Sequence, residues 1–70
     1  MATIYASMAG NICKVLAGKG ESVKSGEEVV ILESMKMEIP ITAEAGGTVK
    51  KLHKQEGDFV DEGDPLMDIE

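Results

Sequence analysis

The chain has 70 residues, with thirteen acidic residues against seven lysines, no arginine and a net charge of −6. A domain of this length buries only a thin core, and with one Phe, one Tyr and no Trp it has little volume for an enclosed substrate pocket, which argues against an enzyme. Because an acidic surface repels phosphate backbones and anionic lipid, nucleic acid and membranes are excluded as expected partners.

The first half of the chain is predicted to form short strands separated by turns. Its strands are marked by β-branched residues and bounded by Gly and Ser, and no segment repeats apolar residues at helical spacing over ten or more positions. Gly26 is expected to take a positive φ in its turn, which a side chain would resist. The expected strands are Thr3–Ala6, Gly10–Val15, Gly20–Val23 and Glu28–Glu33.

The second half repeats the first. When the sequence is shifted by 37 positions, residues 2–33 lie over residues 39–70, and eight of the 32 aligned positions are identical, well above chance for average composition. Gly63 takes the place of Gly26, and the expected strands are Ile39–Ala43, Gly47–Leu52, Gly57–Val60 and Pro65–Glu70. The identical pairs are Ile4/Ile41, Ala6/Ala43, Gly10/Gly47, Lys14/Lys51, Gly20/Gly57, Val23/Val60, Gly26/Gly63 and Glu33/Glu70.

Strict alternation of apolar residues fails in two places. Ile12 and Val15 are three residues apart, as are Leu66 and Ile69, which predicts bulges or strands covered on both sides. The orientation of Cys13 is left open by this pattern. As the single cysteine it excludes an internal disulfide framework and fits a reducing compartment. With no span-length apolar stretch and no signal-peptide pattern, we expect a cytoplasmic protein.

Two like halves predict an all-β sandwich or flattened barrel with a pseudo-twofold axis. Copy one continues through residues 34–38 into copy two, and the equivalent connection from Glu70 would lead back to Thr3. Both chain ends are therefore expected at one end of the molecule, and the turn at 34–37 at the other. A turn so placed is well positioned to meet other proteins.

That turn carries the most informative motif, Glu33-Ser34-Met35-Lys36-Met37-Glu38. Most lysines are solvated surface charges and most methionines fill gaps in a core, so a lysine on a hairpin would ordinarily mean little. Here two thioether side chains flank the lysine on an exposed turn, which is costly unless a partner recognises them.

With this motif the chain closely resembles the biotinyl/lipoyl attachment domain family. Met35-Lys36-Met37 resembles the biotinyl signature, and the resemblance covers essentially the whole chain, although the family more often has Ala in place of Ser34. It implies one domain over residues 1–70, with halves 2–33 and 39–70, an attachment hairpin at 34–37 and two four-stranded antiparallel sheets. The matching framework is Gly20, Val23, Gly26, Val29, Gly57, Val60, Gly63 and Leu66.

The resemblance also implies a function. Lys36 would be joined to biotin through an amide by a separate biotin protein ligase, and would ferry carboxybiotin between biotin carboxylase and carboxyltransferase subunits. The chain would then be a monomeric carrier and not an enzyme. Met35 and Met37 would fill apolar niches on the ligase, and the hairpin flanks Glu33, Ser34 and Glu38 would complete the recognised surface.

Three alternatives remain open. The first is a lipoyl carrier, or a dual acceptor modified by a lipoate ligase, for 2-oxo-acid dehydrogenase or glycine cleavage complexes, because Glu33 three residues before Lys36 is also typical of lipoyl domains. The second is an unmodified binding module. The third, a catalytic Lys36, needs a desolvated amine and is disfavoured on a projecting turn beside Glu33 and Glu38.

Two further features are given structural interpretations. His53 aligns with Leu16 in the repeat, so no metal site is expected there. The acidic run at 56–64 is expected to be a solvated face.

Overall fold

The computed structural model describes residues 2–70 as eight strands, with no helix in that range long and apolar enough to cross a membrane. Met1, which the expected domain included, lies outside the described residues. The all-β prediction is confirmed. The strands are β1 (Ala2–Tyr5), β2 (Gly10–Val15), β3 (Ser22–Val23), β4 (Glu28–Ser34), β5 (Met37–Thr42), β6 (Gly47–Leu52), β7 (Phe59–Val60) and β8 (Pro65–Ile69).

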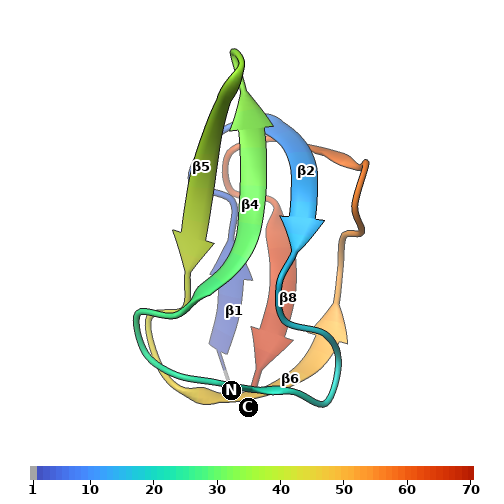
Figure 1. Cartoon of the computed structure of the whole chain (residues 1–70). Helices are drawn as coiled ribbons and strands as arrows, with labels where there is room; N and C mark the ends of the chain where they lie inside the picture. Colours follow the sequence, from blue (N-terminus) through green and yellow to red (C-terminus); the bar gives the residue numbers. More distant parts are fainter. Residues whose placement is uncertain (1) are drawn as a thin grey trace.

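The strands form two four-stranded antiparallel sheets, as expected, in the orders β1-β8-β6-β3 and β5-β4-β2-β7. Figure 1 shows the two sheets packed as layers, with β5, β4 and β2 in front of β1, β8 and β6. Replacing each strand by its counterpart 37 residues away turns one order into the other. The repeat in the sequence is therefore a pseudo-twofold axis between the sheets.

Strand boundaries follow the predictions closely. The strands Gly10–Val15 and Gly47–Leu52 have the expected limits, and most others differ by one or two residues at an end. The main departure is β5, which begins at Met37 and not at Ile39. The reason is that the first residues after the turn still pair with β4, so the hairpin is longer than the repeat alone predicted.

Four bulges interrupt the ladders, in two symmetric pairs. Cys13 is the unpaired residue where β2 meets β4, and Lys50, its counterpart, is unpaired where β6 meets β8. Val29 and Leu66 occupy the same position in the β4–β5 and β1–β8 ladders. A bulge turns two consecutive side chains to one face, which explains why the predicted alternation fails. Cys13 itself is half-buried.

The core lies between the sheets and is aliphatic throughout. Both halves contribute to it, and the described residues contain no buried polar or charged side chain. The largest fully buried side chains are Leu32, Leu66, Met67, Val29, Val30, Val49 and Val60. Fully burying a side chain of this size contributes about 1.5–3 kcal/mol. The fold depends on these contributions, because residues 2–70 contain no helix and the chain has a single cysteine.

Four tight turns are each closed by their own acidic residue. In each, the first residue's N–H donates to the carboxylate three positions later, and a glycine with positive φ of 85° to 93° precedes that carboxylate. The run at 56–64 is mostly exposed, as expected of a solvated face, and within it Asp58 and Asp64 also hold turns. The four donor–acceptor pairs are Gly18–Glu21, Lys24–Glu27, Gln55–Asp58 and Asp61–Asp64.

The molecule is elongated, with extents of 31 × 19 × 17 Å. In Figure 1 the N- and C-terminal ends lie together at the bottom, and the β4–β5 hairpin projects at the top. The last residue, Glu70, is held by two backbone hydrogen bonds to Thr48. The expected separation of the chain ends from the turn at 34–37 is confirmed.

Candidate functional site

The β4–β5 hairpin extends beyond the rest of the fold. In the symmetry-related pair of strands, the β1–β8 ladder begins at Ala2 opposite Ile69, which corresponds to Ile39 opposite Leu32. The hairpin continues past this point by two further pairs, Glu33 opposite Glu38 and Ser34 opposite Met37. Two residues, Met35 and Lys36, then close the turn. We call residues 34–37 the tip.

The turn at the tip is strained. Met35 has φ 53° and Lys36 has φ 66°, and positive φ at both central residues is the requirement of a type I′ hairpin turn, which favours Asn and Gly. A residue with a side chain costs on the order of 1–3 kcal/mol in this region, and such strain collects at functional sites. The conformation holds Lys36 at the outermost point of the chain.

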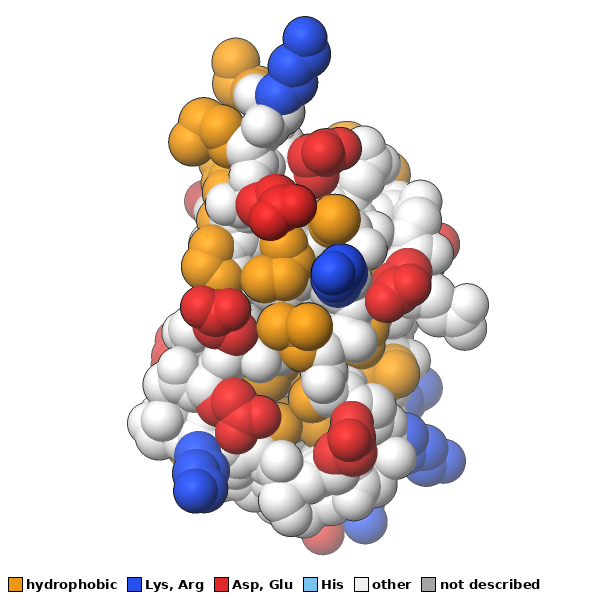
Figure 2. Space-filling model, viewed as in Figure 1, with side chains coloured by type: hydrophobic (Ala, Val, Ile, Leu, Met, Phe, Trp, Pro, Cys, Tyr) orange, Lys and Arg blue, Asp and Glu red, His pale blue; other side chains and the backbone are white. Residues whose placement is uncertain are grey.

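Three of the four side chains of the tip, those of Met35, Lys36 and Met37, are exposed to solvent. Met35 is 91% exposed and Met37 is 62% exposed, whereas Met67 is fully buried. Figure 2 shows a basic side chain at the top of the molecule with apolar side chains beside it. Across residues 2–70 the one ion pair joins His53 to Asp68, so no carboxylate lies within ion-pair distance of the Lys36 amine.

The base of the hairpin is acidic and closely packed. Glu33 and Glu38 are exposed and lie directly opposite each other, while Ser34 is half-buried. Gly10 lies against this base, because a Cβ added there would be 2.7 Å from the Glu33 carbonyl oxygen and 3.4 Å from Ser34 Cβ. This role of Gly10 was not predicted from the sequence, although Gly10/Gly47 and Glu33/Glu70 are two of the identical pairs of the repeat.

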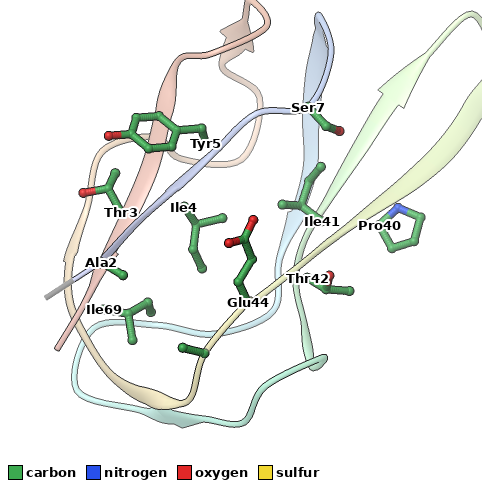
Figure 3. A pocket seen from close by; sticks show the side chains of 11 residues that line it. Ala2, Thr3, Ile4, Tyr5, Ser7, Pro40, Ile41, Thr42, Glu44 and Ile69 are labelled. Atoms are coloured by element: carbon green, nitrogen blue, oxygen red, sulfur yellow. The ribbon is translucent and has the colours of Figure 1, made fainter.

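A groove of about 410 Å³ lies elsewhere, between the edge strands β1 and β5. Figure 3 shows Ile4, Ile41 and Ile69 along it and the Glu44 side chain directed into the gap between the two strands. None of the six residues predicted for the site lines it. The groove is therefore separate from the tip, and the tip itself is a protrusion and not a cavity.

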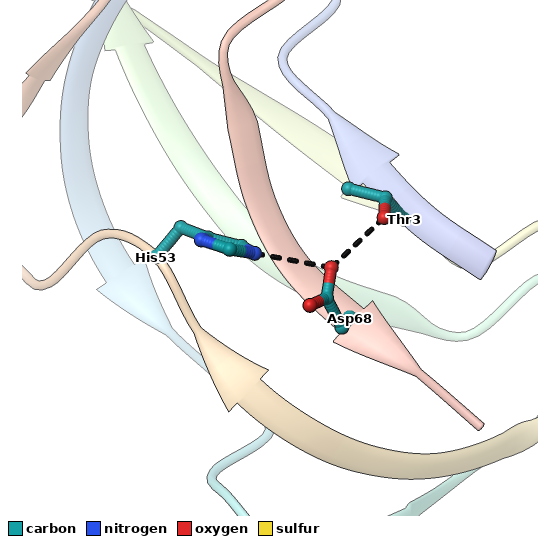
Figure 4. Close-up of polar contacts among 3 residues, drawn as sticks. All are labelled: Thr3, His53 and Asp68. Carbon is teal, nitrogen blue, oxygen red and sulfur yellow. Dashed lines mark hydrogen bonds and ion pairs between the residues drawn. The ribbon is translucent and has the colours of Figure 1, made fainter. Parts of the chain in front are cut away.

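A small polar network lies on the sheet of order β1-β8-β6-β3. Asp68 Oδ1 accepts a hydrogen bond from Thr3 Oγ1 at 2.8 Å and lies 3.0 Å from His53 Nε2, as Figure 4 shows. The hydrogen bond from His53, followed by that from Thr3, lowers the pKa of Asp68 below its ordinary value of 3.8. The contact of His53 with Asp68 ties the end of β6 to β8. Within residues 2–70 no group of three or more His, Cys, Asp or Glu side chains is placed to hold a metal ion.

Comparison with known proteins matches the chain to one family and to two relatives over almost its whole length. Residues 2–69 match the family model described as "Biotin-requiring enzyme". The chain is 54% identical over 67 residues to the biotin/lipoyl attachment protein of Bacillus subtilis, covering 96% of this chain and 92% of that protein. It is 43% identical over 67 residues to the biotin carboxyl carrier protein of Streptococcus mutans, covering 96% of this chain but only 52% of the relative.

The fold agrees with a solved carboxylase structure. A domain of the Kluyveromyces lactis urea carboxylase superposes with a TM-score of 0.90 and 34% identity, over 97% of this chain and 6% of that protein. The same arrangement of strands therefore serves as a small part of a much larger enzyme.

Proposed function

Because the chain belongs to the family of biotin-requiring enzymes, as a homologue of biotin carboxyl carriers and of a biotin/lipoyl attachment protein, we propose that Lys36 is the residue to which biotin is covalently joined. The single observation that carries the proposal is the position of Lys36, at the strained tip of a hairpin that projects from the end of the molecule opposite the chain ends. The chain is then a carrier, modified by a biotin protein ligase.

The tip fits the covalent attachment of biotin. An amide bond requires a primary amine that another enzyme can enclose, and Lys36 is exposed and, within residues 2–70, unpaired. It is also carried two residue pairs beyond the point that corresponds to the start of the β1–β8 ladder. The amine has to give up a proton as the amide forms, and no carboxylate of the described residues lies within ion-pair distance of Lys36, so the ligase has to supply the base. The carrier supplies position, since the paired strands under the turn hold the amine away from the body.

Met35 and Met37 provide the apolar part of the recognised surface. Their thioether side chains are flexible and polarisable, and such side chains adapt to pockets of different shapes. Both the ligase and the later carboxylase partners must accept the same tip. Glu33 and Glu38 at its base add negative charge, which favours partners with cationic side chains near the rim of the site.

Attachment also changes the electrostatics of the tip. Amide formation removes the charge of the lysine, so the tethered group enters apolar pockets without a nearby ammonium. Bound biotin supplies a group that can carry a carboxyl between active sites. Tethering on a small protein raises its effective concentration at the second site. Biotin carboxylase and carboxyltransferase subunits are the partners that this activity requires.

Modification in vitro tests the proposal. The purified chain is incubated with a biotin protein ligase, ATP and biotin, and intact mass and peptide mapping are measured. We expect one biotin per chain, located on Lys36, and none in Lys36→Ala. The matched control is Lys19→Ala, which removes another exposed lysine from a tight turn and should be modified as well as wild type. Biotin retained by Lys36→Ala would contradict the assignment.

A second candidate is favoured by the first relative, whose name includes lipoyl attachment. A lipoyl group would use the same exposed amine and the same hairpin. Parallel incubation with a lipoate ligase distinguishes the two. A lipoyl adduct on Lys36 would make the chain a dual acceptor, and its absence at saturating ligase would restrict the chain to biotin.

A further inference from the structure

A single row of exposed side chains crosses the sheet beneath the tip. Glu38 lies opposite Glu33, Glu33 opposite Asn11, and Asn11 opposite Phe59, so four strands place these residues side by side. Directly opposed residues in antiparallel strands project from the same face, and all four are exposed. At strand spacings near 4.8 Å the row extends about 15 Å. Phe59 lies at its far end and is 60% exposed.

The pseudo-twofold axis supplies a control for this row within the molecule. At the opposite end, beside the chain ends, Ser22 pairs with Thr48, and Thr48 pairs with Glu70 through two backbone hydrogen bonds. Shifted by 37 positions, these three correspond to Phe59, Asn11 and Glu33. The fold therefore accepts a small serine at this position at one end of the molecule, whereas the symmetry-related position at the other end carries a large aromatic ring.

The fold does not use this ring. Phe59 is absent from the hydrophobic core and from the half-buried residues that pack against it, while its neighbour Val60 is fully buried. Five large apolar side chains in residues 2–70 are exposed, and Phe59 joins Met35 and Met37 at the tip end. This ring is 60% exposed, stands in register with the row beneath the tip and is replaced by serine at the symmetric position, so it is the residue of the row best suited to contact a partner.

We infer that Phe59 is a second contact for the ligase that modifies Lys36, one that determines how well this chain is recognised as a substrate. The inference rests on the proposed function. An interface of ordinary size covers about 800 Å² on each partner, which is broad enough to reach from the tip across the row. Buried aromatic side chains dominate the energy of such interfaces, and the ring would fill an apolar pocket while Glu33 and Glu38 meet cationic side chains.

Substitution by the symmetry-related residue tests the role. The variant Phe59→Ser reproduces Ser22, and the matched control Tyr5→Ser removes the other exposed aromatic, which is 57% exposed on β1 of the opposite sheet. Initial rates of biotin incorporation give kcat/KM. We expect a loss of about tenfold for Phe59→Ser, mainly through KM, and less than twofold for Tyr5→Ser. Phe59→Tyr, which keeps the ring, should restore the rate.

A spectroscopic measurement avoids any change of fold. Phe59 is the single phenylalanine of the chain, so incorporation of 4-fluorophenylalanine gives one ¹⁹F resonance that reports this position alone. We expect that resonance to shift or broaden when ligase is added, at protein concentrations where biotin transfer occurs. An unchanged resonance, equal kcat/KM for Phe59→Ser and wild type, or an equal loss in Tyr5→Ser would each overturn the inference. If wild type itself accepts no biotin, the proposed function fails instead.

Discussion

Gly10 packs directly onto the main chain of Glu33, so that a Cβ at residue 10 would stand 2.7 Å from the Glu33 carbonyl oxygen. Strand β2 can approach the base of the hairpin only because this side chain is missing. The pseudo-twofold axis repeats the contact at the other end, where a Cβ at Gly47 would be 2.8 Å from the Glu70 carbonyl oxygen.

Replacing each of these two glycines by alanine distinguishes an effect on the stability of the fold from an effect on the modification of Lys36. Both Gly10→Ala and Gly47→Ala should lower the free energy of unfolding by about 1–3 kcal/mol, because overpacking forces the backbone to shift. Only Gly10→Ala displaces the hairpin, so it alone should slow modification of Lys36. Urea denaturation and rates of biotin transfer, both measured where the variants are folded, check this. Equal transfer rates would show that the hairpin does not depend on Gly10.

Relief of strain at the turn should stabilise the protein and weaken its recognition. Met35→Asn places a residue that tolerates positive φ at the first central position of the type I′ turn, which should raise the free energy of unfolding by about 1 kcal/mol. Loss of the thioether should lower kcat/KM for the ligase. Met35→Leu is the control, because it keeps both strain and apolar surface and should change neither quantity greatly.

Oxidation should act at the tip before the core. Peroxide converts an accessible thioether into a polar sulfoxide, so Met35 and Met37 should react ahead of the buried Met67, and modification of Lys36 should slow in parallel. Peptide mapping at successive times, followed by a methionine sulfoxide reductase to restore the rate, is the measurement. A Met35→Leu, Met37→Leu double variant should keep its rate after peroxide. Early oxidation of Met67 would mean that the core opens more readily than its burial indicates.

The network at Asp68 predicts a loss of stability in acid. Its pKa is lowered in the folded state by the hydrogen bonds from His53 and Thr3, so the unfolded chain binds the proton more tightly. The contribution of Asp68 to the free energy of unfolding is fully present above the ordinary carboxyl pKa. It is lost as the pH falls below about 4 and then through the lowered pKa of the folded state. Melting temperatures between pH 7 and pH 2.5 should fall less steeply for Asp68→Asn than for wild type. Parallel curves of melting temperature against pH would show that Asp68 does not contribute to the loss of stability in acid.

The turn carboxylates should contribute equally in symmetric pairs. Asp58→Ala and Glu21→Ala each remove the acceptor that closes one tight turn, and each should lower the free energy of unfolding by about 1 kcal/mol or less, because the bonds are exposed. The control is Glu62→Ala, whose side chain is exposed and makes no side-chain hydrogen bond within residues 2–70. A larger effect for Glu62→Ala would contradict the assignment of the turns.

Much of the fold could be predicted because the sequence contains it twice. Identical residues 37 positions apart predicted a sandwich or flattened barrel with a pseudo-twofold axis, the position of the chain ends and the hairpin between the halves. The division into two four-stranded sheets was implied by the resemblance to the family. The bulges were predicted only in outline, since the apolar spacing around Ile12 and Leu66 does not reveal which neighbour is left unpaired. In the structure the unpaired residues are Cys13, Lys50, Val29 and Leu66.

Other features of the site depend on backbone geometry that composition does not report. The positive φ of Met35 and Lys36 is contrary to the preference of their side chains, and it arises because two paired strands leave only two residues to reverse the chain. The contact of Gly10 with Glu33 is between residues far apart in sequence. Asp58 and Asp64 were read as solvated because an exposed carboxylate that binds its own turn has the same sequence pattern as one that binds water.

Because the two chain ends lie together, this domain is well suited to insertion into, or fusion with, another protein. A polypeptide joined to either end, or to both at once, leaves from the side farthest from Lys36 in a body 31 Å long. Fusion, tagging or surface immobilisation through the ends therefore leaves the amine unobstructed, whereas a graft into the turn of the β4–β5 hairpin would interrupt the segment that presents it.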